Sequence, residues 1–430
     1  MKLFETISDY WLTLAGILEY EFHLKKSCFR PKSVVERKQY RKLKKLLIIC
    51  QTEIPYYQKL FNEIGFDTER DFKSLDDIKK IPVTEKVVVK EHPEWFVNEK
   101  RKKNALVNHT SGSTGKPMTV YVSRKHWKIE QGVVWRHWSW VGYKFRDKMA
   151  IVRSYTPKNG QLIKHDRIRN FRYYSPFHLS DENMKMYLED MVREDVKFLR
   201  GYPSSIKSLA VYVLQHKCEI PKLKAILTAS EILHDADREI IEKAFNCKIS
   251  NHYGMAECIV MMGDCEEHQG LHNYDEYGYL ELLDTDNPKV KKVIGTCLNN
   301  YAMPILRYET NDLAEVSEKP CPCKRSSMTV HNIIGRTSEV MKLKDREVPL
   351  VNFFTMLEYY TSLRQWQIVQ TSDERVELRL QGYLTATEKE KIETDFKARL
   401  PEYVRYEISM DKLPIQKYEG KVPPFINICS

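Results

Sequence analysis

The sequence predicts an α/β fold: a large N-terminal domain of mixed or parallel sheets with helices, followed by a small α+β C-terminal domain. Two observations predict it. Between residues 125 and 310, helical stretches alternate with short apolar strands such as 148–152 and 223–228, which favours βαβ units. Near the C-terminus, 366–370 and 376–380 alternate like strands and precede a helix-like repeat.

The remaining elements follow from the same periodicities. The first 80 residues read as mostly helical, because Leu43, Leu46 and Leu47 recur at helical spacing. From 105 to 123 the pattern changes to strand-like runs around a loop of small residues. We therefore expect a helical region of the large domain at 1–80, the remainder of that domain at 81–336, and the small domain at 337–430.

Charge and composition limit the classes of partner. The chain has 430 residues, 42% of them hydrophobic, which is enough for a large core. Its net charge of +10 is spread along the sequence, and no nucleic-acid-binding module is recognisable, so we expect no nucleic-acid partner. The strongest basic run, 37–45, is typical of the exposed face of an amphipathic helix; a patch for anionic substrates, nucleic acid or lipid headgroups is the alternative.

The N-terminal region predicts neither a secretory signal nor a membrane span. Acidic residues, among them Glu5, Asp9 and Glu19, interrupt it, and no run approaches the ~20 apolar residues that a span needs. Residues 10–20 could lie on a membrane surface, although packing on the protein is the reading that we favour. Ten cysteines without a dense framework indicate a reducing compartment, so we expect a cytoplasmic protein.

The loop at 110–117 has a composition suited to a triphosphate. Glycines let backbone N–H groups approach phosphate oxygens, hydroxyls add donors, and lysine adds a positive charge. It is not a Walker A loop, because proline follows the lysine. By itself the run could be a flexible turn. The candidate phosphate-binding residues are Thr110, Ser111, Gly112, Ser113, Thr114, Gly115 and Lys116.

This loop resembles the signature loop of the adenylate-forming superfamily, and four further motifs follow in that family's order. They are Tyr253-Gly254-Met255-Ala256-Glu257, Arg307-Tyr308-Glu309-Thr310-Asn311-Asp312, Gly335-Arg336-Thr337-Ser338-Glu339, and Leu413-Pro414-Ile415 with Gly420-Lys421. Stretches at 55–57, 200–205, 228–231 and 300–308 resemble the phenylacetate–coenzyme A ligase group, especially its capsular-polysaccharide (CapK-like) branch. The resemblance covers the chain beyond its first ~50 residues and implies an ATP-dependent, AMP-forming ligase.

The resemblance implies a role for each matched residue. A carboxylate would attack the α-phosphate of ATP, and positioning and charge stabilisation would supply most of the catalysis. Lys116 would hold the β- and γ-phosphates, Glu257 would place Mg²⁺, and Lys421 would reach the α-phosphate from a small domain that rotates between half-reactions. The other expected nucleotide-binding residues are Ser230, Glu231, Tyr253, Gly254, Asp312 and Arg336.

Some motif positions depart from the family pattern. Ala256 replaces the usual Thr, Ser338-Glu339 replaces the paired acids of the hinge, and the spacing before Gly420-Lys421 is longer than in the family pattern. Asn311 replaces a glycine, which is a mild change because Asn tolerates the left-handed backbone that Gly would adopt.

A second constellation of soft ligands predicts structural zinc. Cys265, His272, Cys321 and Cys323 provide the thiolates and imidazole of a closed tetrahedral site, with His268 as the substitute for His272. Similar Cys…Gly-Leu-His…Cys-x-Cys patterns occur in the capsule-type branch. Separate buried thiols and surface histidines are the alternative.

The acid and its acceptor are the least constrained features. Arginines such as Arg153 and Arg172, among many aromatic residues, favour a polar, anionic or sugar-linked carboxylic acid. Coenzyme A and an amine are the two candidate acceptors. A non-catalytic relative is the third hypothesis, which the presence of Lys116, Glu257, Asp312 and Lys421 disfavours. Peripheral membrane contact and the oligomeric state stay open.

Overall fold

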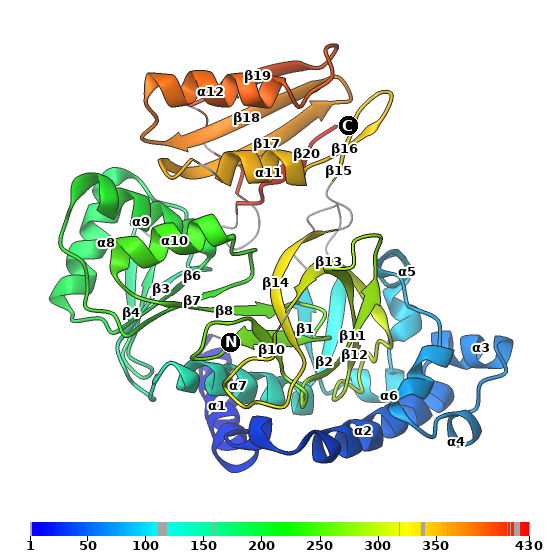
Figure 1. The fold of residues 1–430 in the computed structure, drawn as a ribbon. Helices are drawn as coiled ribbons and strands as arrows, with labels where there is room; N and C mark the ends of the chain where they lie inside the picture. The colour runs from blue at the N-terminus through cyan, green and yellow to red at the C-terminus, as the bar shows by residue number, and fades with distance from the viewer. Residues whose placement is uncertain are drawn as a thin grey trace. The chain divides into compact units, whose positions relative to one another are not determined.

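The computed structural model describes residues 2–109, 118–157, 160–317, 319–336, 340–358, 360–410, 412, 414–416 and 422–429. The chain forms two compact units (Figure 1). Unit 1 consists of Met1–Gly142 and His252–Ile334, and unit 2 of Tyr143–Asn251 and Gly335–Ser430. Each unit is therefore built from two separate stretches of sequence.

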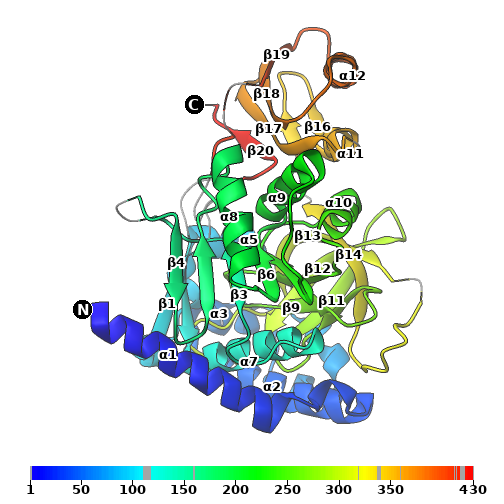
Figure 2. The same ribbon diagram turned by 90° about the vertical axis from the view of Figure 1, so that its left-hand side faces the viewer.

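Unit 1 begins with helices, as the periodicity of the first 80 residues predicts. The α-helices are α1 (Lys2–Glu19), α2 (Lys32–Glu53), α3 (Pro55–Glu63), α4 (Thr68–Asp71), α5 (Lys86–Glu91), α6 (Glu99–Lys102) and α7 (Arg124–Trp140). Shorter helical turns, including the π-helix η1 (Tyr20–Leu24), connect them. Helix α1 lies against α7 (Figure 2). In α2, the apolar residues Leu43, Leu46 and Leu47 are fully buried, which confirms that face as the core face.

The strands of unit 1 place the candidate site. They are β1 (Ala105–His109), β2 (Thr119–Ser123), β8 (Ile249–Gly254) from His252 onward, β9 (Met261–Asp264), β10 (Leu271–Asn273), β11 (Gly278–Asp284), β12 (Val290–Cys297), β13 (Tyr308–Val316) and β14 (Thr329–Arg336) as far as Ile334. β1 and β2 form a hairpin in which His109 pairs with Thr119. The other seven follow the order β11-β12-β13-β14-β10-β9-β8, and the pairs β11–β12, β12–β13, β14–β10, β10–β9 and β9–β8 are antiparallel.

Unit 2 contains the βαβ pattern. Its strands are β3 (Met149–Val152), β4 (Ile163–Asp166), β5 (Phe171–Tyr174), β6 (Phe198–Gly201) and β7 (Ala225–Ala229), and its helices are α8 (Asp181–Arg193), α9 (Pro203–His216) and α10 (Asp235–Phe245). The order is β7-β6-β3-β5-β4, parallel except for β4. Every residue of β3 and β7 is buried, as expected of parallel strands.

The C-terminal part of unit 2 is a small α+β arrangement. Its elements are β15 (Val340–Lys342), β16 (Glu347–Pro349), α11 (Val351–Glu358), β17 (Leu363–Ser372), β18 (Arg375–Gly382), α12 (Ala386–Lys397), β19 (Arg405–Ser409) and β20 (Phe425–Asn427). The sheet order is β19-β18-β17-β20. A capping box between Thr385 and Glu388 starts α12. The predicted α/β class is confirmed, whereas the domain limits drawn at 80 and 336 stay predictions.

Candidate functional site

Several expected site residues lie outside the described part of the chain. They are the phosphate loop 110–117 with Lys116, the catalytic candidate Lys421, and the hinge residues 337–339. Arg336 is the last residue of β14, but its side chain is not described. The loop connects the paired ends of β1 and β2, so a two-stranded hairpin fixes both of its flanks.

Glu257, the expected Mg²⁺ residue, lies just after β8 and is only 4% exposed. The Lys86 Nζ atom lies 3.0 Å from its Oε1 atom, and the Tyr308 hydroxyl donates to the same oxygen at 3.1 Å. Burial opposes ionisation of Glu257, but Lys86 and the hydrogen bonds outweigh it and lower the pKa of the carboxyl below its ordinary value. Glu257 is thus held as a carboxylate, the form that Mg²⁺ binds.

The position of Lys86 depends on Arg307, the first residue of the 307–312 motif. The Arg307 guanidinium donates to both oxygens of Glu281, at 2.9–3.2 Å, and to the carbonyl of Ile81 at 2.6 Å. The Thr84 backbone amide donates to the Arg307 carbonyl. These bonds attach the segment before α5 to β13, next to Glu257. No sequence pattern indicated Lys86, because this contact joins residues far apart in the chain.

Asp312, the expected ribose-binding residue, lies in β13 and is 8% exposed. The Tyr253 hydroxyl donates to Asp312 Oδ2 at 2.6 Å, and the Asp312 amide donates to Thr310 Oγ1. Asn311 has a φ of 65°, the left-handed conformation that Asn tolerates in place of Gly. Together with the bond from Tyr308 to Glu257, this gives two hydrogen bonds between the 253–257 and 307–312 motifs. Gly254, next to Tyr253, ends β8.

Ser230 and Glu231 follow β7 in unit 2. Ser230 has a φ of 74°, a conformation that costs energy in a non-glycine residue. Arg153, which follows β3, donates to Ser230 Oγ at 3.3 Å, and Glu231 accepts from the Ser204 amide at 3.1 Å. These residues meet because the carboxyl ends of the parallel strands β3, β6 and β7 share one edge, the usual ligand edge of such sheets.

The two arginines proposed to recognise an anionic acid differ in their surroundings. Arg172 donates to both oxygens of the buried Asp190, at 2.8 and 2.9 Å, so its charge is used within the fold. Arg153 contacts Ser230 Oγ and lies 5.1 Å from the centroid of the Tyr202 ring. Burial, with the Arg153 charge adding, lowers the pKa of the neighbouring Arg200 to about 9. The structure therefore favours Arg153 over Arg172 for this role.

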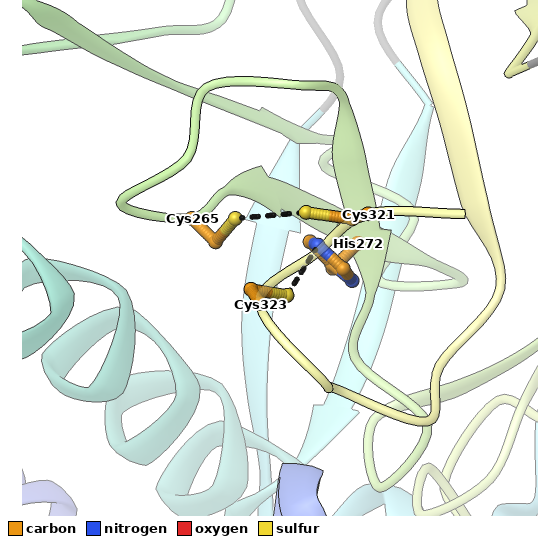
Figure 3. A group of neighbouring side chains, drawn as sticks. All are labelled: Cys265, His272, Cys321 and Cys323. Carbon is orange, nitrogen blue, oxygen red and sulfur yellow. Dashed lines mark hydrogen bonds between the residues drawn. The ribbon is translucent and has the colours of Figure 1, made fainter. Parts of the chain in front are cut away.

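The four predicted zinc ligands converge. One ligand atom from each of Cys265, His272, Cys321 and Cys323 lies within 4.8 Å of all the others, and His268 is not in the group. Figure 3 shows the two close pairs: Cys265 Sγ is 3.5 Å from Cys321 Sγ, and Cys323 Sγ is 3.4 Å from His272 Nε2. Cys265 follows β9, His272 lies in β10, and the other two lie between β13 and β14.

The surroundings of this group suit a metal ion. His272 Nδ1 lies 3.2 Å from Ser327 Oγ and 3.4 Å from Thr329 Oγ1, an arrangement that orients Nε2 toward the sulfurs. Burial, with the Arg325 charge adding, lowers the pKa of His272 to about 4, so the ring is neutral. Burial opposes ionisation of Cys323, yet Arg325 outweighs it and lowers the pKa of that thiol. Three sulfurs and one imidazole fit tetrahedral Zn²⁺ without an open position.

Cys258 also has a more specific setting than the sequence indicated. Its sulfur lies within 4.8 Å of ligand atoms of His126 and Glu130, both on α7. The Tyr277 hydroxyl donates to Glu130 at 2.8 Å, and burial raises the pKa of Glu130. The Tyr277 hydrogen bond satisfies the Glu130 carboxyl within the fold, so this group has a structural explanation without a metal.

Known proteins resemble the chain in sequence and in fold, although no family model matches it. It is 26% identical over 328 residues to the phenylacetate–coenzyme A ligase of Thermus thermophilus, covering 73% of each chain. Over 304 residues it is 26% identical to protein CapK of Staphylococcus aureus, covering 66% of this chain and 65% of that protein.

Among solved structures, 2-hydroxyisobutyryl-CoA ligase in complex with R3-HIB-AMP superposes with a TM-score of 0.70. That match has 17% identity and covers 92% of this chain and 90% of the other, which supports the shared fold. Together, the sequence relatives, the ordered motifs and this shared fold support the resemblance of the chain to the adenylate-forming superfamily and to its phenylacetate–coenzyme A ligase group.

Proposed function

We propose that the protein joins a carboxylic acid to ATP as an acyl-adenylate and then transfers the acyl group to the thiol of coenzyme A. The observation that carries this proposal is the pair of buried carboxylates at motif positions, Glu257 and Asp312, each held by a donor of unit 1. Relatives named phenylacetate–coenzyme A ligase favour coenzyme A over an amine as the acceptor.

The reaction has two displacements. A carboxylate oxygen of the acid bonds to the α-phosphorus of ATP, and the bond to the bridging oxygen breaks, so that pyrophosphate leaves. The sulfur of the deprotonated thiol then bonds to the acyl carbon, and AMP leaves with its oxygen. Lys116 and the 110–117 loop would hold the leaving phosphates, Asp312 would accept from the ribose hydroxyls, and Lys421 would stabilise charge on the α-phosphate.

Glu257 would hold Mg²⁺, which neutralises phosphate charge when it is bound. The fixed carboxylate suits this role, because Lys86 and Tyr308 orient one of its oxygens and keep the group ionised. Tyr253, Gly254, Ser230 and Glu231 would surround the adenine, with Arg336 near the ribose.

The acid in this proposal is polar or anionic, with uronic acids and amino-sugar acids as the first class to test. Arg153 supports it, since a guanidinium at the ligand edge of parallel strands can pair with a carboxylate or phosphate. A role in polysaccharide synthesis is the finer form of the same proposal.

We also propose structural Zn²⁺ at Cys265, His272, Cys321 and Cys323. Four protein ligands leave no site for substrate, so the ion would hold together the loops after β9 and before β14 rather than take part in the reaction.

ATP–pyrophosphate exchange across a panel of carboxylic acids tests the activity. Exchange with at least one acid in the wild type, lost in Lys421→Ala, is the expected result; wild-type exchange with none of the acids would favour the non-catalytic hypothesis. AMP release that depends on coenzyme A supports the thiol acceptor, and release that depends on an amine supports amide formation.

The same assay compares the two arginines. Arg153→Ala should raise the KM of the acid about tenfold with unchanged stability, since it removes one charged contact. Arg172→Ala leaves Asp190 buried without its main partner and should mainly lower the melting temperature. An unchanged KM in Arg153→Ala contradicts the polar-acid proposal.

A further inference from the structure

Helix α1 and the adjoining π-helix η1 expose a row of large apolar side chains. Trp11 is 67% exposed, Leu14 44%, Leu18 45% and Phe22 76%. Their spacing of three and four residues places them along one helix face. Scattered exposed hydrophobic residues are common, but a continuous row of this kind marks an interaction surface. We refer to these four residues as the α1 stripe.

The opposite face of the same helix is already packed. Gly16 lies so close to α7 that a Cβ atom there would be 2.3 Å from Gln131 Cβ. Leu24 is buried against Gly132, and Lys128 forms an ion pair with Glu19 at 2.9 Å. The helix is therefore seated on α7 (Figure 2). The residues of the α1 stripe are exposed and lie on the helix face opposite Gly16, so the stripe faces away from that contact.

The chain that follows the stripe is strongly basic. Residues 22–45 contain ten Lys or Arg and a single acid, Glu36, for a net charge of +9. On α2, Arg37, Arg41 and Lys45 recur every four residues on the exposed face, and the described part of the chain offers them no acidic partner within ion-pair distance. A hollow of about 410 Å³ lies beside them, lined by Tyr40, Arg41, Lys44, Lys45, Ile48, Ile49 and Arg101.

We propose that this surface docks the protein on an anionic lipid membrane. The α1 stripe would enter the boundary between headgroups and acyl chains, and the cations of α2 would contact lipid phosphates. A large apolar face next to many Lys and Arg residues is the composition of helices that lie in the membrane interface. No helix among the described residues is long and apolar enough to cross a membrane.

The charge argues for a membrane and against a second copy of this chain. A two-fold symmetric dimer brings the same surface of each copy together. Here it would place two segments of net charge +9 near each other, and like charges across an interface weaken it. An anionic membrane complements both the apolar row and the positive charge.

Flotation of the full-length protein with vesicles tests the proposal. We expect binding to vesicles of phosphatidylcholine mixed with phosphatidylglycerol, at least about tenfold weaker binding to pure phosphatidylcholine, and release by high salt. Trp11→Ser combined with Phe22→Ser should lower the partition coefficient at least about tenfold, because both side chains lose their burial in lipid. Ile168→Ser, at a residue 50% exposed in unit 2, is the matched control and should bind as the wild type does.

A charge variant separates the electrostatic contribution to membrane binding from the contribution of the apolar side chains. Arg41→Glu combined with Lys45→Glu should weaken binding to the anionic vesicles at least about fivefold, whereas Lys389→Glu with Lys391→Glu, on the exposed side of α12, should not. Melting temperatures and pyrophosphate exchange show that each variant is folded. Wild-type protein that floats with neither vesicle overturns the proposal. The proposal is also overturned if the wild-type protein binds no vesicles, forms a dimer in light scattering, and becomes monomeric when Trp11→Ser is combined with Phe22→Ser.

Discussion

Unit 1 contains two polar clusters that satisfy their charges in opposite ways. Around Glu257 and Asp312, each carboxylate already faces a donor: Lys86 and Tyr308 for the first, Tyr253 for the second. We refer to this as the carboxylate cluster. In the group of Cys265, His272, Cys321 and Cys323, sulfurs and an imidazole nitrogen instead face one another.

The difference concerns what each cluster needs from outside. In the carboxylate cluster, donors from the protein already satisfy both carboxylates, so a bound ligand adds chemistry to a site that is ordered without it. The cysteine–histidine cluster concentrates electron pairs that a cation would balance, so its metal would contribute to folding itself. Loss of the ligand should therefore reduce rate in one cluster and stability in the other.

The largest expected effect is on rate. Glu257→Gln replaces the carboxylate by a neutral amide that can still accept from Tyr308 but holds Mg²⁺ poorly. Pyrophosphate exchange should fall at least about 100-fold, with little change in melting temperature. Glu309→Gln, which alters a pair with Lys292 on the same strand as Asp312, is the control and should retain most of the activity. Unchanged exchange in Glu257→Gln would remove this residue from the site.

The second effect is on stability. Cys323→Ser, or removal of metal by a chelator, should lower the melting temperature by at least about 5 °C. Metal analysis should find one Zn²⁺ per wild-type chain and less than half of that in the variant. Cys429→Ser, at an exposed thiol outside the cluster, should change neither quantity. If zinc-free protein has the same melting temperature as the wild type, the cysteine–histidine cluster, like the carboxylate cluster, is stable without a ligand.

The third effect is on affinity. Tyr253→Phe removes the 2.6 Å hydrogen bond to Asp312 while keeping the ring. The KM for ATP should rise about tenfold with a small change in kcat, since a hydrogen bond to a charged group is lost. Tyr279→Phe, on β11 and outside every motif, is the matched control. A large fall in kcat with unchanged KM would mean that Tyr253 acts on the reaction rather than on nucleotide binding.

The smallest effect is a pH dependence. In the wild type, the lowered pKa of Glu257 stabilises the fold above the unfolded-state value of about 4.3, and this contribution disappears as pH falls through the lower folded-state value. Lys86→Met leaves only the hydrogen bonds to oppose burial, which is the largest contribution, so the pKa should rise above that value and ionisation should instead destabilise the fold as pH rises.

Melting curves between pH 4 and 8 measure this reversal. The stability difference between wild type and Lys86→Met should grow with pH by about 1 kcal/mol. Lys59→Met, which removes an exposed pair with Glu63, should show no such growth. A difference that is the same at every pH would mean that Lys86 does not control the ionisation of Glu257.

The sequence predicted the residues of both clusters better than their partners. Glu257 and Asp312 lie in contiguous motifs, and the four soft ligands stand out by residue type, so each could be named without coordinates. Lys86 could not, because the Arg307 bonds that bring it to Glu257 join segments more than 200 residues apart. Arg153 and Arg172 look equivalent in sequence. Only the packing of β5 against α8 shows that Arg172 is paired with Asp190.

The same limit applies to the N-terminal helices. Periodicity correctly predicted α2, yet it could not tell which apolar residues of 10–20 meet the protein and which meet solvent. That distinction depends on the close approach of Gly16 to α7, which is a tertiary contact.

The Arg307 contacts also determine where this chain could be shortened or recombined. Because the guanidinium donates to the carbonyls of Lys79 and Ile81, the helical N-terminal region is bonded to the strand that carries Asp312. A shortened chain that starts after residue 81 would lose both of these acceptors and expose part of a buried charge. Chimaeras with related proteins should therefore exchange the N-terminal region and β11–β13 together, so that Arg307 and its acceptors come from the same parent.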